Sequence, residues 1–308
     1  MTKTPVVEHH FADLEDVRLH YVTEGSGPPV VLLHGWPQTW YCWRRVMRLI
    51  ASAGYRAIAP DLRGLGDSST AENGYDKRTI AEDIWQLVHD ELGYDTVRVV
   101  GHDMGGIVGY ALAVAHSEAV SHLVVVDVAI PGDGSSDISQ KGRRWHHAFH
   151  QTSLPEALVA GREEIYLRWF YRNYAYNQSA ITDADVVEYL RTYRRASSLS
   201  AGFEFYRTLP QDREQNERLS KERVLEVPVL AVGGGEGFGR GFEVATSLQN
   251  LAVDVRALVV EKSGHWIPEE QPEALAQGIL DFFRDTPHRR VRDESRADES
   301  MLEVEEPA

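Results

Sequence analysis

An aspartate stands at the apex of a glycine-flanked turn. Residues 101–105 read Gly-His-Asp-Met-Gly, and Asp103 lies between an apolar run at 96–100 and a stretch of small residues that predicts a helix. A strand-to-helix turn of this type lifts its central side chain above a sheet, and glycines flank it because the two backbones crowd there. We therefore predict that Asp103 is a nucleophile.

The residue type at this apex decides the class of chemistry. A serine that attacked a saturated carbon would form an ether, which water does not readily cleave. A carboxylate forms an ester instead, and an activated water can hydrolyse it. Asp103 thus indicates displacement at an sp³ carbon, and the lack of a serine or cysteine at this position excludes a serine esterase.

Such an ester needs a general base and an acid that orients it. His265 follows the last predicted strand and can take a proton from water. Two acids follow other predicted strands, Asp127 after residues 122–126 and Glu236 in a glycine-rich loop. The carboxyl ends of parallel strands meet at one edge of a sheet, so either acid could reach His265.

Hydrolysis of the ester also needs hydrogen-bond donors for the oxyanion. Residues 34–37, His-Gly-Trp-Pro, end another predicted strand and can present the backbone N–H of Trp36 beside that of Met104. Two such donors would stabilise the tetrahedral oxyanion formed when water attacks the Asp103 ester.

The elements that position these residues follow from the apolar pattern. Short apolar runs alternate with helical patterns, which predicts an α/β fold with a mostly parallel sheet flanked by helices. The predicted strands are residues 17–21, 29–33, 56–59, 96–100, 122–126, 227–232 and 255–260, and the predicted helices 41–53, 78–92, 104–116 and 272–284.

The middle of the chain departs from this alternation. Residues 132–223 are rich in Arg, Tyr, Trp and His and contain helical patterns without a convincing strand, which predicts a helical cap inserted into the core. The core then consists of residues 1–131 and 224–286. Residues 287–308 are dense in Arg, Asp and Glu, and we predict a disordered charged tail there.

Composition limits the partners. A formal net charge of −15 and a pI near 5.3 argue against nucleic acid and anionic membrane surfaces. No apolar run approaches the roughly 18 residues of a membrane span, and the N-terminus lacks the apolar segment of a secretion signal. Because Cys42 is the single cysteine, the chain cannot form an internal disulfide, which fits a reducing compartment, and it is expected to be cytoplasmic. No residue spacing predicts a metal or cofactor site.

Four motifs in order resemble the α/β-hydrolase superfamily and, within it, the epoxide hydrolases. They are residues 34–37, 61–68 (Asp-Leu-Arg-Gly-Leu-Gly-Asp-Ser), 101–106 and 264–266 (Gly-His-Trp), and the resemblance covers residues 9–284. It implies the α/β-hydrolase fold and the conversion of a small apolar epoxide and water to a vicinal diol, without a cofactor.

The resemblance also implies how the epoxide oxygen is protonated. Epoxide hydrolases generally use two tyrosines from the helical cap, which is also called the lid. Residues 203–207 resemble the segment that carries the second one, at Tyr206. Residues 145–149 resemble a variant subgroup in which a histidine replaces the first tyrosine, which implies His146, with His147 as its competitor. The same subgroup favours Asp127 over Glu236 as the acid.

Two other functions are compatible with the same fold. A haloalkane or haloacid dehalogenase has the same nucleophile, but haloalkane members usually carry Asn in the 34–37 motif and Trp after the nucleophile, whereas this chain has Trp36 and Met104. Haloacetate members usually carry Arg after the nucleophile.

A non-catalytic ligand-binding protein of the same fold has no need of nucleophile, base and lid donors together. The sequence leaves a homo-oligomer open.

Overall fold

An eight-stranded, mostly parallel sheet forms the centre of the computed structural model, which describes residues 7–135 and 138–286. Its strands are β1 Glu8–Asp13, β2 Arg18–Gly25, β3 Pro29–Leu33, β4 Arg56–Pro60, β5 Val97–His102, β6 Val120–Val126, β7 Val229–Gly234 and β8 Val255–Val260. They lie in the order β1-β2-β4-β3-β5-β6-β7-β8; β2 pairs antiparallel with both β1 and β4, and all the other neighbouring pairs are parallel. The predicted fold class is thus confirmed.

The central strands are buried on both faces. Every residue of β3 (PVVLL) and β6 (VSHLVVV) is buried, as expected where helices cover both sides of a parallel sheet. Strand β8 lies at an edge and exposes Arg256 and Ala257. The fully buried strands β3 and β6 are thus among the strands that the predicted site residues follow in the chain.

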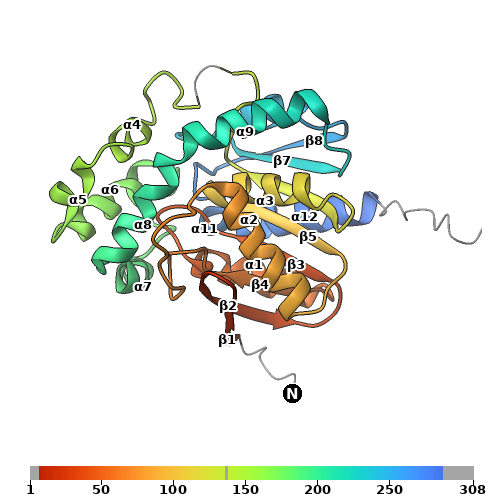
Figure 1. The fold of residues 1–308 in the computed structure, drawn as a ribbon, viewed down its shortest axis with the longest axis horizontal. Helices are drawn as coiled ribbons and strands as arrows, with labels where there is room; N and C mark the ends of the chain where they lie inside the picture. Colours follow the sequence, from red (N-terminus) through yellow and green to blue (C-terminus); the bar gives the residue numbers. More distant parts are fainter. Residues whose placement is uncertain (1–6, 136–137, 287–308) are drawn as a thin grey trace, which may run out of the picture.

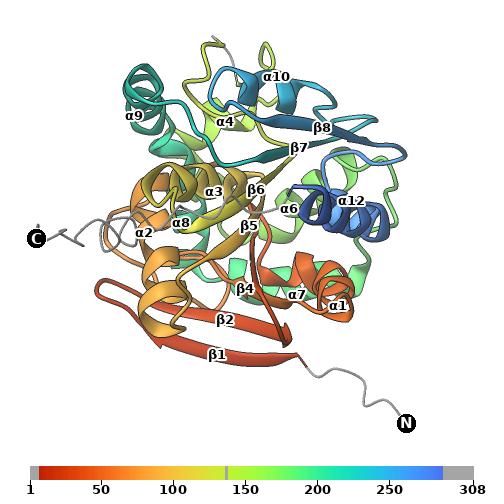
Figure 2. The same ribbon diagram turned by 90° about the vertical axis from the view of Figure 1, so that its right-hand side faces the viewer.

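Helices flank both faces of the sheet. They are η1 Trp40–Trp43 (3-10), α1 Arg44–Ser52, α2 Lys77–Trp85, η2 Gln86–Glu91 (π), α3 Met104–Ala115, α10 Glu243–Gln249, α11 Ile267–Glu270 and α12 Pro272–Asp285. Figure 2 shows α2 and α3 on one side of the sheet and α1 and α12 on the other. These two layers enclose the apolar strands.

A further set of helices lies between β6 and β7 in the chain. They are α4 His146–His150, α5 Leu154–Val159, α6 Glu163–Asn173, α7 Asp183–Tyr193, α8 Ala196–Arg207 and α9 Leu209–Glu222. Helices α4 to α8 gather at one end of the sheet, and α9 leads back toward β7 (Figure 1). No strand occurs in the described part of this stretch, and we propose residues 132–223 as the cap.

Some elements differ from the sequence prediction. The helix predicted over 41–53 begins with the 3-10 turn η1, and the one over 78–92 ends in the π-helix η2. Strand β1 was not predicted, because its sequence EHHFAD is mostly polar and it pairs along an exposed edge. The charged tail at 287–308 lies outside the described residues. Across the described chain, no helix combines the length and apolarity that crossing a bilayer requires.

Candidate active site

The turn between β5 and α3 holds Asp103 at its apex. Its backbone adopts φ 53° and ψ −127°, a conformation that costs a non-glycine residue about 1–3 kcal/mol. The flanking glycines leave no room for a side chain. A Cβ on Gly101 would lie 2.1 Å from the carbonyl oxygen of Gly105, and one on Gly105 would lie 2.3 Å from that of Leu33. The predicted sharp turn is therefore present.

Backbone donors already contact the Asp103 carboxylate. The Trp36 N–H donates to Oδ1 at 3.0 Å, and the Met104 N–H helps to lower the pKa of this carboxyl. Gly35 permits the approach, since a Cβ there would lie 2.4 Å from the Asp103 Cβ. His34 fixes the same loop, because its Nε2 accepts the Leu62 N–H at 3.0 Å. Both predicted oxyanion donors thus lie on the predicted nucleophile.

His265 lies between two carboxylates. Its Nε2 is 3.5 Å from Asp103 Oδ2, and its Nδ1 is 2.7 Å from Asp127 Oδ2. Asp127 follows β6, and its other oxygen accepts the backbone N–H groups of Gly234 at 3.0 Å and Arg240 at 2.7 Å. Glu236 is exposed in the loop after β7. Of the two acids left open by the spacing, Asp127 is therefore the one that contacts His265.

The charges of Asp103, His265 and Asp127 support one another. Burial alone would raise the pKa of both carboxyls, but the hydrogen bonds and charge of His265 outweigh it and lower the pKa of Asp103 and of Asp127. For His265, burial lowers the pKa, and the hydrogen bonds to the two carboxylates outweigh it and raise the pKa. The site therefore keeps Asp103 ionised, as a nucleophile must be.

Tyr206 reaches the site from α8. The residue is fully buried, and its hydroxyl has no hydrogen-bond partner among the described residues. Burial raises the pKa of this phenol well above its ordinary value, so the hydroxyl keeps its proton. Its ring lies edge-on to Trp36 at 5.6 Å. Gly202, one turn earlier, lets the Trp36 indole approach α8, since a Cβ there would lie 2.8 Å from the indole.

All three histidines of α4 lie beside Tyr206, and the His150 ring centroid is 4.5 Å from that of Tyr206. The Tyr206 ring centroid is 5.4 Å from that of His146 and 5.5 Å from that of His147. The His146 ring also stacks on Trp36 at 6.0 Å, and its Nδ1 lies 3.1 Å from the Tyr174 hydroxyl. For the His147 ring, the described residues provide no hydrogen bond. The structure therefore brings both candidates to Tyr206 and anchors His146 more firmly.

Glu270, which the sequence did not single out, holds the loop that carries His265. Its Oε1 accepts the N–H groups of Gly264 at 3.0 Å and Trp266 at 3.2 Å, which bracket His265. Its Oε2 accepts the N–H groups of residues 176–177. Since all four partners are backbone groups, no residue pattern could have indicated this contact. The loop of His265 is thus joined to the helical stretch above the sheet.

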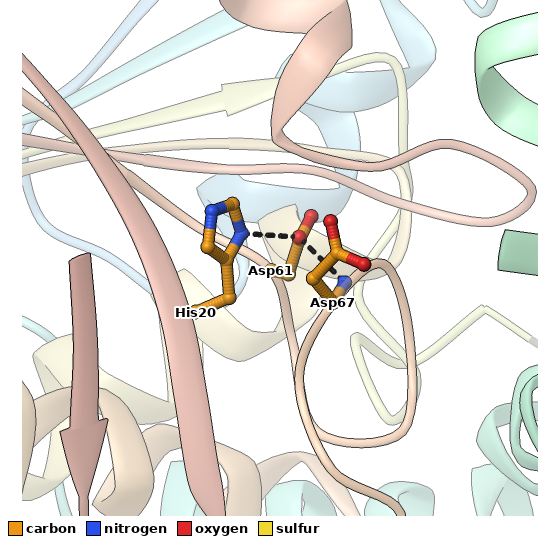
Figure 3. A group of neighbouring side chains, drawn as sticks. All are labelled: His20, Asp61 and Asp67. Carbon is orange, nitrogen blue, oxygen red and sulfur yellow. Dashed lines mark hydrogen bonds and ion pairs between the residues drawn. The ribbon is translucent and has the colours of Figure 1, made fainter. Parts of the chain in front are cut away.

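A cluster of metal-ligating residue types lies beside His34, whose Nε2 is 3.8 Å from Asp61 Oδ1. Ligand atoms of His20, Asp61 and Asp67 lie within 4.8 Å of one another (Figure 3). Asp61 Oδ2 lies 2.7 Å from His20 Nδ1 and accepts the Asp67 N–H at 2.9 Å, and its Oδ1 accepts the Trp40 N–H at 2.8 Å. Arg191 forms an ion pair with the Asp67 carboxylate. These bonds account for the cluster as a loop-shaping element.

Known proteins resemble the chain over most of its length. Residues 28–272 match the family described as alpha/beta hydrolase fold. The soluble epoxide hydrolase of Corynebacterium sp. (strain C12) is 39% identical, over 90% of this chain and 97% of that protein. The solved epoxide hydrolase CorEH superposes with a TM-score of 0.84 at 38% identity, covering 92% of this chain and 100% of that one. Cfl2 of Burkholderia cenocepacia gives 0.83 at 39% identity, covering 92% and 98%.

Proposed function

The chain belongs to the alpha/beta hydrolase fold family and, within it, to the epoxide hydrolases, and we propose that it converts a small apolar epoxide to a vicinal diol through an ester on Asp103. One observation carries this proposal. The Trp36 N–H holds Oδ1 of Asp103 while Oδ2 faces His265, so the carboxylate already has the orientation that an ester intermediate would need.

In the first half-reaction, Oδ2 attacks an epoxide carbon, because Oδ1 accepts the Trp36 N–H. The new Oδ2–C bond replaces a C–O bond of the ring, and the ring oxygen takes the Tyr206 proton. A buried hydroxyl without a partner costs about 1–3 kcal/mol, and an epoxide oxygen would supply the missing acceptor. We assign the second hydrogen bond to His146, which Trp36 and Tyr174 hold in place.

In the second half-reaction, water attacks the ester carbon. Esterification removes the Asp103 charge that raises the pKa of His265, which favours the neutral imidazole that can accept a proton from water. Asp127 stabilises the resulting imidazolium. The Trp36 and Met104 N–H groups bind the oxyanion on Oδ1, and each such donor typically contributes about 10²- to 10³-fold in rate.

The protons balance over the cycle. Collapse of the tetrahedral intermediate releases the diol alkoxide, which takes the proton from His265. The regenerated Asp103 carboxyl loses its proton to solvent, and the Tyr206 phenolate takes one up. The net reaction consumes one epoxide and one water.

The test uses the full chain with His265→Gln, which should form the ester but fail to hydrolyse it. The variant is incubated separately with small epoxides and with haloalkanes, and its intact mass and peptide map are recorded. A gain equal to the whole epoxide, located on Asp103, is expected. A gain of only the alkyl group of a haloalkane would indicate a dehalogenase, and no adduct with either class would support a binding protein.

A further inference from the structure

Tyr174 joins the lid histidine to the loop of the base. It follows α6, and its side chain is buried. Its carbonyl oxygen accepts the backbone N–H of His265 at 2.9 Å, while its hydroxyl lies 3.1 Å from Nδ1 of His146. Its ring stacks on Phe238 at 4.2 Å, with the two planes 13° apart. These contacts fix the direction in which the hydroxyl points.

The protons of this pair can be assigned from the groups around it. Burial raises the pKa of Tyr174 to about 12, so the phenol keeps its proton at neutral pH. Burial, with the charges of neighbouring His147, His150 and Arg144, lowers the pKa of His146 well below its ordinary value, so the ring is neutral. The pair therefore holds one O–H and one ring N–H.

Only one placement of those two protons gives the Tyr174 O–H a hydrogen-bond acceptor. Among the described residues, Nδ1 of His146 is the only hydrogen-bond partner of the Tyr174 hydroxyl. If Nδ1 carried the ring proton, the buried O–H would have no acceptor, at a cost of about 1–3 kcal/mol. The O–H therefore donates to Nδ1, and the ring proton lies on Nε2, because the bond at one ring nitrogen sets the tautomer at the other.

We propose that Tyr174 is a positioning residue that holds His146 as its Nε2–H tautomer, so that this N–H donates to the oxygen of the opening epoxide. The proposal rests on the function proposed above and assigns different roles to His146 and Tyr206. A neutral imidazole that lost its Nε2 proton would become an imidazolate. His146 therefore donates a hydrogen bond, and Tyr206 supplies the proton that the oxygen keeps.

A neighbouring pair offers a matched control. The Tyr166 hydroxyl lies 2.7 Å from Nε2 of His150, in the same group of lid aromatics. Tyr166→Phe removes the same hydroxyl from the same kind of pair without touching His146. Tyr174→Phe keeps the carbonyl that holds the His265 loop. A difference between the two variants therefore reports on the Tyr174–His146 hydrogen bond.

The first measurement needs no substrate. In the full-length protein with ¹⁵N-labelled histidine, long-range ¹H–¹⁵N NMR spectra should show His146 as the Nε2–H tautomer, and Tyr174→Phe should shift it toward a mixture. Tyr166→Phe should leave the His146 signals unchanged. A wild-type His146 that carries its proton on Nδ1 would overturn the proposal, whether or not the protein opens epoxides.

The second measurement follows ester formation by rapid quench with styrene oxide. Tyr174→Phe should slow alkylation of Asp103 by about 10-fold or more, the effect of losing one well-aligned hydrogen bond, and leave ester hydrolysis nearly unchanged. Tyr166→Phe should alter alkylation by less than about threefold. Equal alkylation rates in the two variants, with folded protein in both, would refute the assignment. Failure of the parent to form any ester would refute the proposed function instead.

Discussion

Replacing Asp127 with asparagine should stop the second half-reaction and spare the first. In the native site, one oxygen of Asp127 accepts two backbone N–H groups, and the other lies 2.7 Å from Nδ1 of His265. An asparagine must place its carbonyl oxygen on the two backbone donors, since its NH₂ group cannot accept them. The NH₂ group then faces Nδ1 and donates to it.

The size of the effect follows from this geometry. With Nδ1 acting as an acceptor, the neutral ring carries its proton on Nε2, the nitrogen that must take a proton from water. The same exchange in a serine protease triad lowers the turnover rate about 10⁴-fold, or roughly 5.5 kcal/mol in activation free energy. We expect a similar loss in ester hydrolysis. Alkylation of Asp103 should change far less, because it needs no proton transfer to His265.

Single-turnover kinetics with intact-mass detection separate the two steps. The Asp127→Asn variant should accumulate the Asp103 ester, while Glu236→Gln, which changes the exposed acid of the neighbouring loop, should turn over like the wild type. The reasoning is refuted if Asp127→Asn hydrolyses its ester within about 10-fold of the wild-type rate. It is equally refuted if Glu236→Gln is the variant that accumulates the ester.

Three further predictions concern the donor, the base and the cap. Tyr206→Phe should slow alkylation by about 10² or more, since it removes the proton donor, and should leave ester hydrolysis within a few-fold, as rapid quench can show; equal slowing of both steps would contradict the role. Asp103→Asn should lower the pKa of His265, because it removes one of the two carboxylates that raise it, and an NMR titration that finds no downward shift would count against the stated cause. Lys77→Met removes the ammonium that lies 2.8 Å from the buried Asp212 carboxylate and should cost about 3–5 kcal/mol of unfolding free energy in urea. Arg213→Met, at an exposed pair, should leave the urea midpoint nearly unchanged; equal losses would show that burial of the pair does not matter.

The positions of Asp103 and His265 at strand ends could be predicted because the sequence signals for them are local. Asp103 lies in a turn that requires glycines, because a Cβ at Gly101 or Gly105 would lie 2.1–2.3 Å from a backbone oxygen, and this requirement is visible in adjacent residues of the sequence. The strands that alternate with helices could likewise be predicted, because they contain apolar runs such as that of β6. Strand β1 could not be predicted in this way, because a strand at an exposed edge of the sheet needs few apolar residues.

The partners of these residues depend on the three-dimensional arrangement. Asp127 and Glu236 both follow strands, and only the folded loops decide that one is buried on His265 while the other faces solvent. Tyr174 looked like one aromatic among many in the predicted cap. Its hydroxyl contacts a histidine 28 positions earlier in the chain, a distance over which no sequence period operates.

The central claim is that the oxygen added to the epoxide comes from Asp103. The most direct test is to let the wild-type protein turn over an excess of styrene oxide in water labelled with heavy oxygen, and then to measure the mass of the peptide that contains Asp103. The mechanism predicts heavy oxygen in that carboxylate, and unlabelled diol from a single turnover of fresh enzyme. An unlabelled peptide, together with labelled diol from the first turnover, would mean that water attacks the epoxide directly and that Asp103 forms no ester.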